Sequence, residues 1–284
     1  MRTPGRPRQL ALALLVVLAL PAAAADPLAW GVTTDDPWAD TDDQARALAA
    51  LPQRPALRVV FDVAVGPEEY REPLETLGGV ATIMGEMVDS SDALQLDDAA
   101  FRTRVDGYLA ALWPLVDVWE IGNEVNGGWT GAPARQALRV AYAFDAVTDR
   151  GGRTALTLYA NFGCLEEGEE DPLTWSERHL APELRDGLDY VLLSWWPDDC
   201  AAPPPDWQAV FDALGLLFPH AALGIGETGA HDAAAAAHQA AWCYAPGIDH
   251  ARFIGGCFWW EFRTDMVPAG APLWQVLAAA MANR

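Results

Sequence analysis

Short apolar segments and longer segments of helical period alternate along almost the whole chain. Each apolar segment is nearly continuously hydrophobic and ends at polar residues, glycine or proline, which is typical of a strand buried on both faces. The expected strands are 28–32, 56–63, 80–87, 116–122, 153–159, 188–195, 222–226 and 253–260. The expected helices are 40–51, 70–77, 97–112, 134–149, 176–184, 205–218, 232–243 and 273–282.

An alternation of strand and helix that repeats eight times without a long linker predicts an α/β fold. We expect a single-domain (β/α)8 TIM barrel over residues 26–284, since a chain of about 250 residues is typical of that architecture. An open doubly wound sheet is the alternative. It fits less well, because the first strand-to-helix turn lacks the glycine-rich fingerprint that binds dinucleotide phosphates.

Residues 1–25 have the order of charged, apolar and small residues that is typical of a secretory signal peptide. Arg2, Arg6 and Arg8 precede an apolar run that is too short to span a bilayer, and small residues follow up to Ala25. A buried N-terminal helix is the alternative interpretation. We expect cleavage after Ala25, a secreted or periplasmic protein, and no membrane association once the signal peptide is removed.

The composition excludes several classes of function. The chain has a formal net charge of −22, and all 18 of its basic residues are arginine. Without lysine there is no Schiff-base chemistry on a lysine, no pyridoxal phosphate enzyme and no phosphate-binding P-loop lysine. The acidic surface also argues against binding to nucleic acid.

Four cysteines in an exported chain indicate disulfide bonds, although the number alone permits three connectivities. The order of the expected strands favours a bond between Cys164 and Cys200, which leaves Cys243 to pair with Cys257. A zinc site is the alternative, but no two of these cysteines have the close spacing of zinc ligands.

Two glutamates stand where expected strands end. Glu124 follows the fourth strand and Glu227 follows the seventh, and the carboxyl ends of barrel strands form the active-site face. Two carboxyl groups within about 5 Å can cleave a glycosidic bond, one as a proton donor and the other as a nucleophile. The alternative is that both are solvated loop residues, as most glutamates are.

The segments Trp119–Glu124 and Gly226–Gly229 resemble the strand-four and strand-seven endings of the clan A (β/α)8 retaining glycoside hydrolases, the superfamily of cellulases, mannanases and xylanases. The resemblance implies that Glu124 is the acid/base, that Glu227 is the nucleophile and that Asn123 binds the sugar 2-hydroxyl. It implies no cofactor and no metal.

Further candidate residues lie at other strand ends. Arg58 on the second strand is similar to the clan's arginine that supports the nucleophile, and we expect it to keep the pKa of Glu227 low. The end of strand eight is similar to the clan's strand with a tryptophan at the floor of the sugar subsite, and alternation along the strand means that one of Trp259 and Trp260 points inward. We favour Trp260 as that residue.

The expected sixth strand departs from the clan's pattern, and the role of one further acidic residue, Glu86, has two interpretations. Many clan members end strand six with a tyrosine, whereas this chain has Trp195 and Trp196, which we expect to contact substrate. Glu86, at the end of strand three, is expected either to contact substrate hydroxyls or to cap a loop.

The sequence therefore predicts a secreted, monomeric glycoside hydrolase that cleaves a β-linked poly- or oligosaccharide with retention of configuration. A barrel that binds carbohydrate without cleaving it, or a decayed relative of a glycosidase, is the alternative. A metal-dependent hydrolase is a third possibility, but no pair of strand-end histidines supports it.

Overall fold

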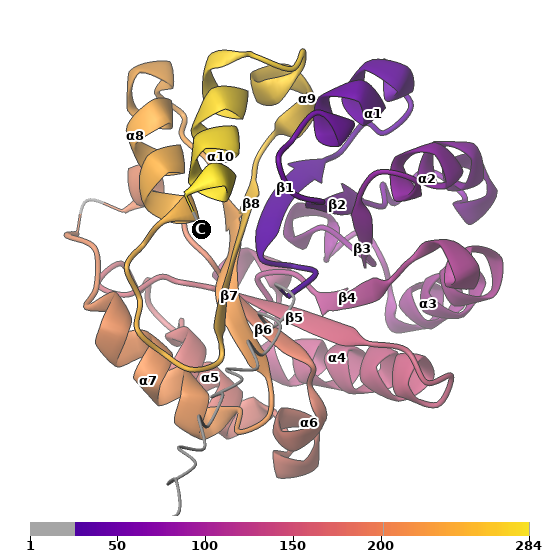
Figure 1. The fold of residues 1–284 in the computed structure, drawn as a ribbon. Coiled ribbons are helices and arrows are strands. Elements are labelled where there is room, and N and C mark those ends of the chain that lie inside the picture. The colour runs from indigo at the N-terminus through magenta and orange to yellow at the C-terminus, as the bar shows by residue number, and fades with distance from the viewer. Residues whose placement is uncertain (1–25, 201, 284) are drawn as a thin grey trace, which may run out of the picture.

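Eight parallel strands close into a barrel in the computed structural model, which describes residues 26–200 and 202–283 (Figure 1). Each strand pairs with the next in chain order, and β8 pairs with β1 to complete the ring. The strands are β1 (Trp30–Thr34), β2 (Ala56–Val60), β3 (Thr82–Glu86), β4 (Val118–Gly122), β5 (Thr154–Tyr159), β6 (Tyr190–Ser194), β7 (Ala222–Thr228) and β8 (Phe253–Trp259). The single (β/α)8 barrel predicted from the sequence is confirmed. The expected signal peptide, residues 1–25, lies outside the described residues.

Helices surround the barrel on its outer face (Figure 1). They are α1 (Thr41–Ala49), α2 (Arg71–Gly78), α3 (Asp98–Leu112), α4 (Pro133–Thr148), α5 (Pro172–His179), α6 (Pro182–Gly187), α7 (Trp207–Leu217), α8 (Ala233–Tyr244), α9 (Phe262–Met266) and α10 (Pro272–Ala282). None of the helices described is long and apolar enough to cross a membrane.

The single helix predicted at 176–184 is wrong. The structure has two short helices there, α5 and α6, and the residues between them, Leu180 and Ala181, have extended backbone conformations. The physical reason is Pro182, because a proline disfavours the helical conformation in the residue before it. The short helix α9, which follows β8, was not predicted from the sequence.

Alternation along the strands separates two apolar cores. Inward residues fill the interior of the barrel in one buried cluster, which includes Ala56, Met84, Val118, Leu192 and Phe258. Outward residues of the same strands join the helices in a second, larger core. Successive residues of a strand face opposite sides. The residue two positions beyond each of these interior residues, toward the carboxyl end of its strand, therefore also points into the barrel and lies closer to its mouth.

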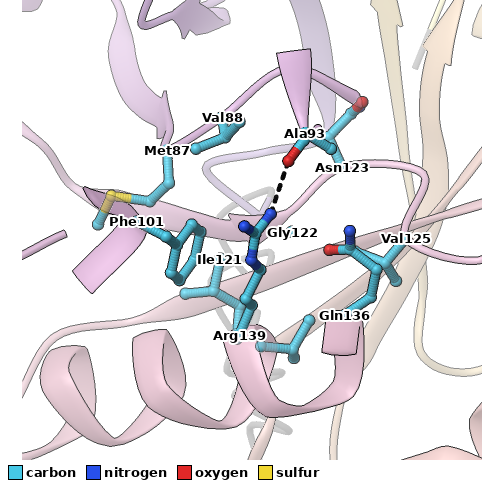
Figure 2. Close-up of a pocket in the computed structure, with 11 residues that line it drawn as sticks. Met87, Val88, Ala93, Phe101, Ile121, Gly122, Asn123, Val125, Gln136 and Arg139 are labelled. Carbon is cyan, nitrogen blue, oxygen red and sulfur yellow. Dashed lines mark hydrogen bonds between the residues drawn. The ribbon is translucent and has the colours of Figure 1, made fainter. Parts of the chain in front are cut away.

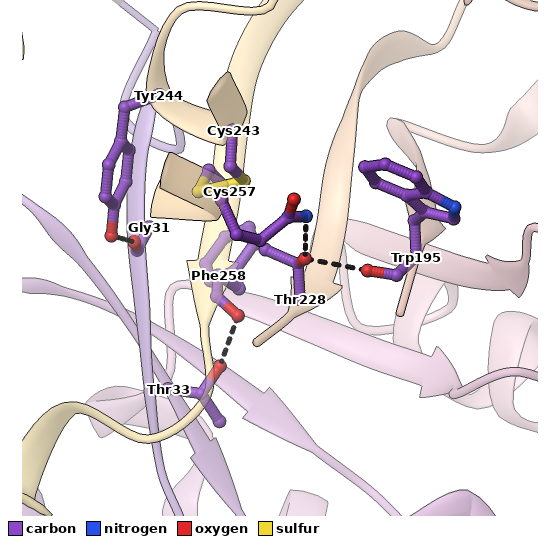
Figure 3. Close-up of a disulfide and its surroundings, with 9 residues drawn as sticks. Gly31, Thr33, Trp195, Thr228, Cys243, Tyr244, Cys257 and Phe258 are labelled. Atoms are coloured by element: carbon purple, nitrogen blue, oxygen red, sulfur yellow. Dashed lines mark hydrogen bonds between the residues drawn. A yellow bond between two sulfur atoms is a disulfide. The ribbon is translucent and has the colours of Figure 1, made fainter. Parts of the chain in front are cut away.

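Both disulfides have the pairing expected from the sequence. Cys164 is bonded to Cys200 with a Cα–Cα distance of 5.8 Å, which joins the loops after β5 and β6. Cys243 on α8 is bonded to Cys257 on β8 with a Cα–Cα distance of 5.5 Å (Figure 3). The first bond connects two loops at the same end of the barrel as Glu124 and Glu227.

Candidate active site

A layer of charged side chains lies directly above the apolar interior. Two positions beyond Ala56, Met84 and Val118, the three strands present Arg58, Glu86 and Glu120. The exposed fraction of each of these three side chains is 1% or less. Burial of charged groups is costly unless they are paired, so their mutual arrangement must supply that pairing.

Among the described residues, Arg58 is the one cation that contacts three carboxylates. Its Nε donates to Glu120 Oε2 at 2.6 Å, and its Nη1 donates to Glu227 Oε2 at 2.7 Å. Its Nη2 lies 3.0 Å from Glu86 Oε2. Thr157 on β5 donates a further hydrogen bond to Glu120. The guanidinium is therefore fixed by Glu120 from β4 and directed at Glu227 from β7, as the sequence analysis expected for Arg58 and Glu227.

One cation among several carboxylates leaves the site short of positive charge. Burial raises the pKa of Glu227 to about 8, and the negative charge of Glu124 adds to this, while Arg58 acts in the opposite direction. Burial also raises the pKa of Glu86 well above its usual range. Arg58 thus acts to lower the pKa of Glu227, as expected, but burial acts in the opposite direction and is the larger cause.

Glu124 is held in a different way, by hydroxyl groups. Ser90 Oγ donates to its Oε2 at 2.8 Å, and Ser194 Oγ at the end of β6 donates to its Oε1. Its exposed fraction is 6%, and burial raises its pKa while the two hydroxyl groups lower it. Glu124 has a backbone φ of 46°, in the left-handed region that residues other than glycine rarely adopt. Such conformations cluster at functional sites.

The loop that carries Ser90 is connected to the end of β4. The backbone N–H of Ser90 donates to Asn123 Oδ1 at 3.0 Å, and Asn123 Nδ2 has no hydrogen-bond partner among the described residues. Arg139 on α4 donates to the carbonyl of Ala93 at 2.7 Å and closes the small cavity beneath this loop (Figure 2). Asn123 and Glu124 are thus supported by one continuous network, and the amide of Asn123 retains a free donor.

The four candidate tryptophans separate into two pairs. Trp259 is fully buried outside the barrel, with its indole N–H on Asp265, and Trp195 packs edge to face on Trp207 and Trp242. Neither indole of this pair faces the barrel mouth.

Trp260 and Trp196 form the second pair, and both are half-buried at the ends of their strands. The ring of Trp196 stacks on the ring of His231, with 5.4 Å between the ring centroids. It also lies against Gly229, which is two residues beyond Glu227. Of the four, Trp196 and Trp260 are therefore the ones available to a ligand.

Sequence reasoning missed three residues that contact the site: Ser90, Ser194 and Glu120. Ser194 lies two positions beyond the interior residue Leu192, and Glu120 lies two positions beyond the interior residue Val118. Because side chains alternate along a strand, this spacing was the signal that could have identified both. Ser90 carried no such signal, since it lies in a loop after β3. Glu86, expected to touch substrate or cap a loop, is instead completely buried beside Arg58.

The described part of the chain contains no group of three or more histidines, cysteines, aspartates or glutamates arranged to hold a metal ion. The loop 166–171 after β5 carries five acidic residues, and some of their carboxylates bind within the protein. Glu170 pairs with Arg178 and His179, and Asp171 caps the first turn of α5.

Comparison with solved structures gives matches over most of the chain at low identity. A glycoside hydrolase family 5 enzyme from Prevotella bryantii B14 matches with a TM-score of 0.59 and 13% identity, over 90% of this chain and 96% of that one. Fpglu1 from Fervidobacterium pennivoraus matches with a TM-score of 0.61 and 10% identity, over 87% and 84% of the two chains. A broad-specificity endoglucanase from an uncultured bacterium matches with a TM-score of 0.55 and 14% identity, over 89% and 86%. The chain shares the fold of these enzymes. No family model and no curated protein matches its sequence.

Proposed function

We propose that the protein is an exported glycoside hydrolase of the clan A type, which cleaves a β-linked glycan with retention of configuration. The observation that carries the proposal is the unequal surroundings of two buried carboxyl groups at one barrel mouth. Glu227 is in direct contact with a guanidinium, whereas Glu124 is held by two hydroxyl groups and contacts no cation directly in the part of the chain that the structure describes. A retaining glycosidase requires this kind of inequality, because one carboxyl group must be ionised while the other carries a proton.

The two carboxyl groups titrate as a pair, since each influences the other, and burial favours retention of a proton in that pair. We assign that proton to Glu124. The 2.7 Å contact with Arg58 stabilises negative charge on Glu227, whereas the serine hydroxyl groups of Ser90 and Ser194 can accept as well as donate.

In the first step, Glu227 attacks the anomeric carbon and Glu124 gives its proton to the departing glycosidic oxygen. The C–O bond to the leaving group breaks as the bond to Glu227 forms, and the product is a covalent glycosyl ester. In the second step, Glu124, now ionised, removes a proton from water. The water oxygen bonds to the anomeric carbon, the ester bond breaks, and both carboxyl groups return to their first state.

The free Nδ2 of Asn123 supports this assignment, because a buried amide donor without a partner suits a sugar hydroxyl. The half-buried rings of Trp196 and Trp260 offer flat apolar faces at the same end of the barrel. The structural neighbours include an endoglucanase and a β-glucosidase, which favours β-linked glucans as the first substrates to test.

The experiment is a hydrolysis screen of β-1,3- and β-1,4-linked gluco-, manno- and xylo-oligosaccharides with the wild-type protein and Glu227→Gln. We expect hydrolysis of at least one substrate by the wild type and none by the variant. If the wild type cleaves none of them, and Glu227→Gln binds one of them as tightly as the wild type does, the chain is a carbohydrate-binding barrel and the proposal is wrong.

A further inference from the structure

One tryptophan in the loop after β4 differs from the others discussed above. The exposed fraction of Trp129 is 41%, and it is the one tryptophan among the large apolar side chains that the described residues expose. Trp129 lies five residues after Glu124, in the short loop that leads to α4. Exposure of a large aromatic ring at the mouth of a barrel requires an explanation, because burial would be more favourable.

The loop of Trp129 is anchored to the backbone of Glu124. The N–H of Gly127 donates to the carbonyl of Glu124 at 2.8 Å, and Thr130 Oγ1 donates to the carbonyls of Gly127 and Val125. Because these bonds are short and local, any displacement of Trp129 is coupled to the residue that we assign as acid/base.

The ring of Trp129 is held against the loop and against the end of β5. A Cβ atom on Gly127 would lie 2.6 Å from the ring, so only glycine permits this packing. The ring also meets Tyr159 edge to face, with 4.9 Å between the ring centroids. Asn126 exchanges two hydrogen bonds with the backbone of Tyr159, at 2.7 and 2.9 Å, and fixes the two elements together.

Tyr159 places this aromatic pair beside the site. Tyr159 lies two positions beyond Thr157 and four beyond Ala155, and the side chains of both point into the barrel, where Thr157 contacts Glu120. By the alternation along β5, the side chain of Tyr159 lies on the same side of the strand. Burial raises the pKa of Tyr159 to about 12, and the nearby carboxylates Asp199, Glu124 and Glu169 act in the same direction. Trp129 and Tyr159 therefore lie on the Glu124 side of the mouth, whereas Trp196 lies against Gly229 beyond Glu227.

We infer that Trp129 and Tyr159 form the subsite for the leaving-group sugar. This inference rests on the proposed function, in which Glu124 protonates the oxygen of the leaving group. The sugar attached to that oxygen must lie next to Glu124, and a pyranose packs its apolar C–H face on an aromatic ring. The chemical class of the ligand is a neutral pyranose linked through the bond to be cleaved.

The kinetic test compares two substrates that differ only in the leaving group. One is the β-linked oligosaccharide that the wild type cleaves best, and the other is the matching β-glycosyl fluoride, in which no sugar leaves. We expect Trp129→Ala to lower kcat/KM for the oligosaccharide about tenfold and to affect the fluoride much less. Trp129→Phe should restore part of the loss. Leu216→Ala removes an exposed apolar side chain on α7 and serves as the matched control.

A binding measurement separates failure of the subsite from failure of the function. In Glu227→Gln, the Kd for each oligosaccharide is measured by calorimetry with and without Trp129→Ala. A weaker Kd with Trp129→Ala shows that the ring binds sugar, and together with the larger loss on the oligosaccharide it supports the leaving-group subsite. An unchanged Kd together with equal losses on both substrates overturns the subsite and leaves the proposed function standing. No binding and no cleavage of any oligosaccharide overturns both.

Discussion

The two carboxyl groups of the site are supported by different chemistry, although both are buried at the same barrel mouth. Glu227 accepts a hydrogen bond from Arg58, which Glu120 holds in place, and Thr157 donates to Glu120. Glu124 rests on Ser90 and Ser194, two neutral hydroxyl groups. A rigid ion pair favours one protonation state, whereas hydroxyl groups that can donate or accept tolerate both. In the proposed mechanism, the support beneath each carboxyl group, and not its burial alone, distinguishes the nucleophile from the acid/base.

The largest expected effect is that of Glu227→Gln. The amide cannot form the covalent bond to the sugar, so the rate of oligosaccharide hydrolysis should fall by about 10⁴-fold or more. Steady-state kinetics measures the loss, and circular dichroism checks that the barrel is still folded. A variant that retains a tenth of the activity would contradict the role of Glu227 as nucleophile.

Glu124→Ala should have the next largest effect, and one that depends on the substrate. Loss of a proton donor typically costs about 10² to 10⁴-fold, so hydrolysis of an oligosaccharide should be slowed strongly. A β-glycosyl fluoride needs less protonation as its fluoride leaves, and its covalent intermediate should therefore still form. Pre-steady-state kinetics with both substrates measures this difference. Equal losses on the two substrates would mean that Glu124 is not the general acid.

Glu120→Gln and Glu86→Gln form a matched pair, because both residues are buried beside Arg58. Glu120 accepts from Arg58 and Thr157, and we expect its amide to misplace the guanidinium and to lower kcat by about 10²-fold. Burial raises the pKa of Glu86, which favours its neutral form, so a neutral amide should change kcat at most about threefold. Similar losses in both variants would show that Arg58 depends equally on the two carboxyl groups.

Ser194→Ala should have the smallest effect on rate and a clear effect on pH dependence. The Ser194 hydroxyl group lowers the pKa of Glu124, so its removal raises that pKa. In the wild type, activity should fall on the alkaline side as the carboxyl pair loses its proton, and burial raises the pKa of both Glu124 and Glu227. In the variant, this alkaline limb should move to higher pH.

A pH–rate profile of kcat/KM measures the position of that limb. Ser91→Ala is the control, because Ser91 is exposed beside Ser90 and its hydroxyl group has no contact with Glu124 among the described residues. If the alkaline limb lies at the same pH in Ser194→Ala as in the wild type, the Ser194 hydroxyl group does not affect the titration of Glu124 and Glu227.

The barrel could be predicted from the sequence because its strands are apolar on both faces. The continuous hydrophobic runs, separated by helical periods, leave few other folds open, and the disulfide pairing followed from the order of the strands. The break between α5 and α6 was missed because apolar periodicity continues across Pro182, whereas the backbone restriction that proline imposes acts on a single residue.

The candidate site was predicted only in part. Glu124, Glu227 and Arg58 stand at strand ends or carry charge within an apolar run, so they are conspicuous in the sequence. Ser90 is a small polar residue in a loop, and its contact with Glu124 depends on how that loop folds back. The protonation of these carboxyl groups also depends on how many of them contact Arg58. The three contacts join residues on different strands, so they are visible only in the three-dimensional structure.

The most direct test of the central claim is to identify the residue that bonds to the sugar. The wild-type protein is inactivated with 2-deoxy-2-fluoro-β-glycosyl fluorides that match the sugars of the oligosaccharide screen, and the labelled peptide is sequenced by mass spectrometry. We predict a single covalent sugar on Glu227. A label on Glu124, or hydrolysis of the glycan by an enzyme that none of these reagents labels, would contradict the proposed mechanism.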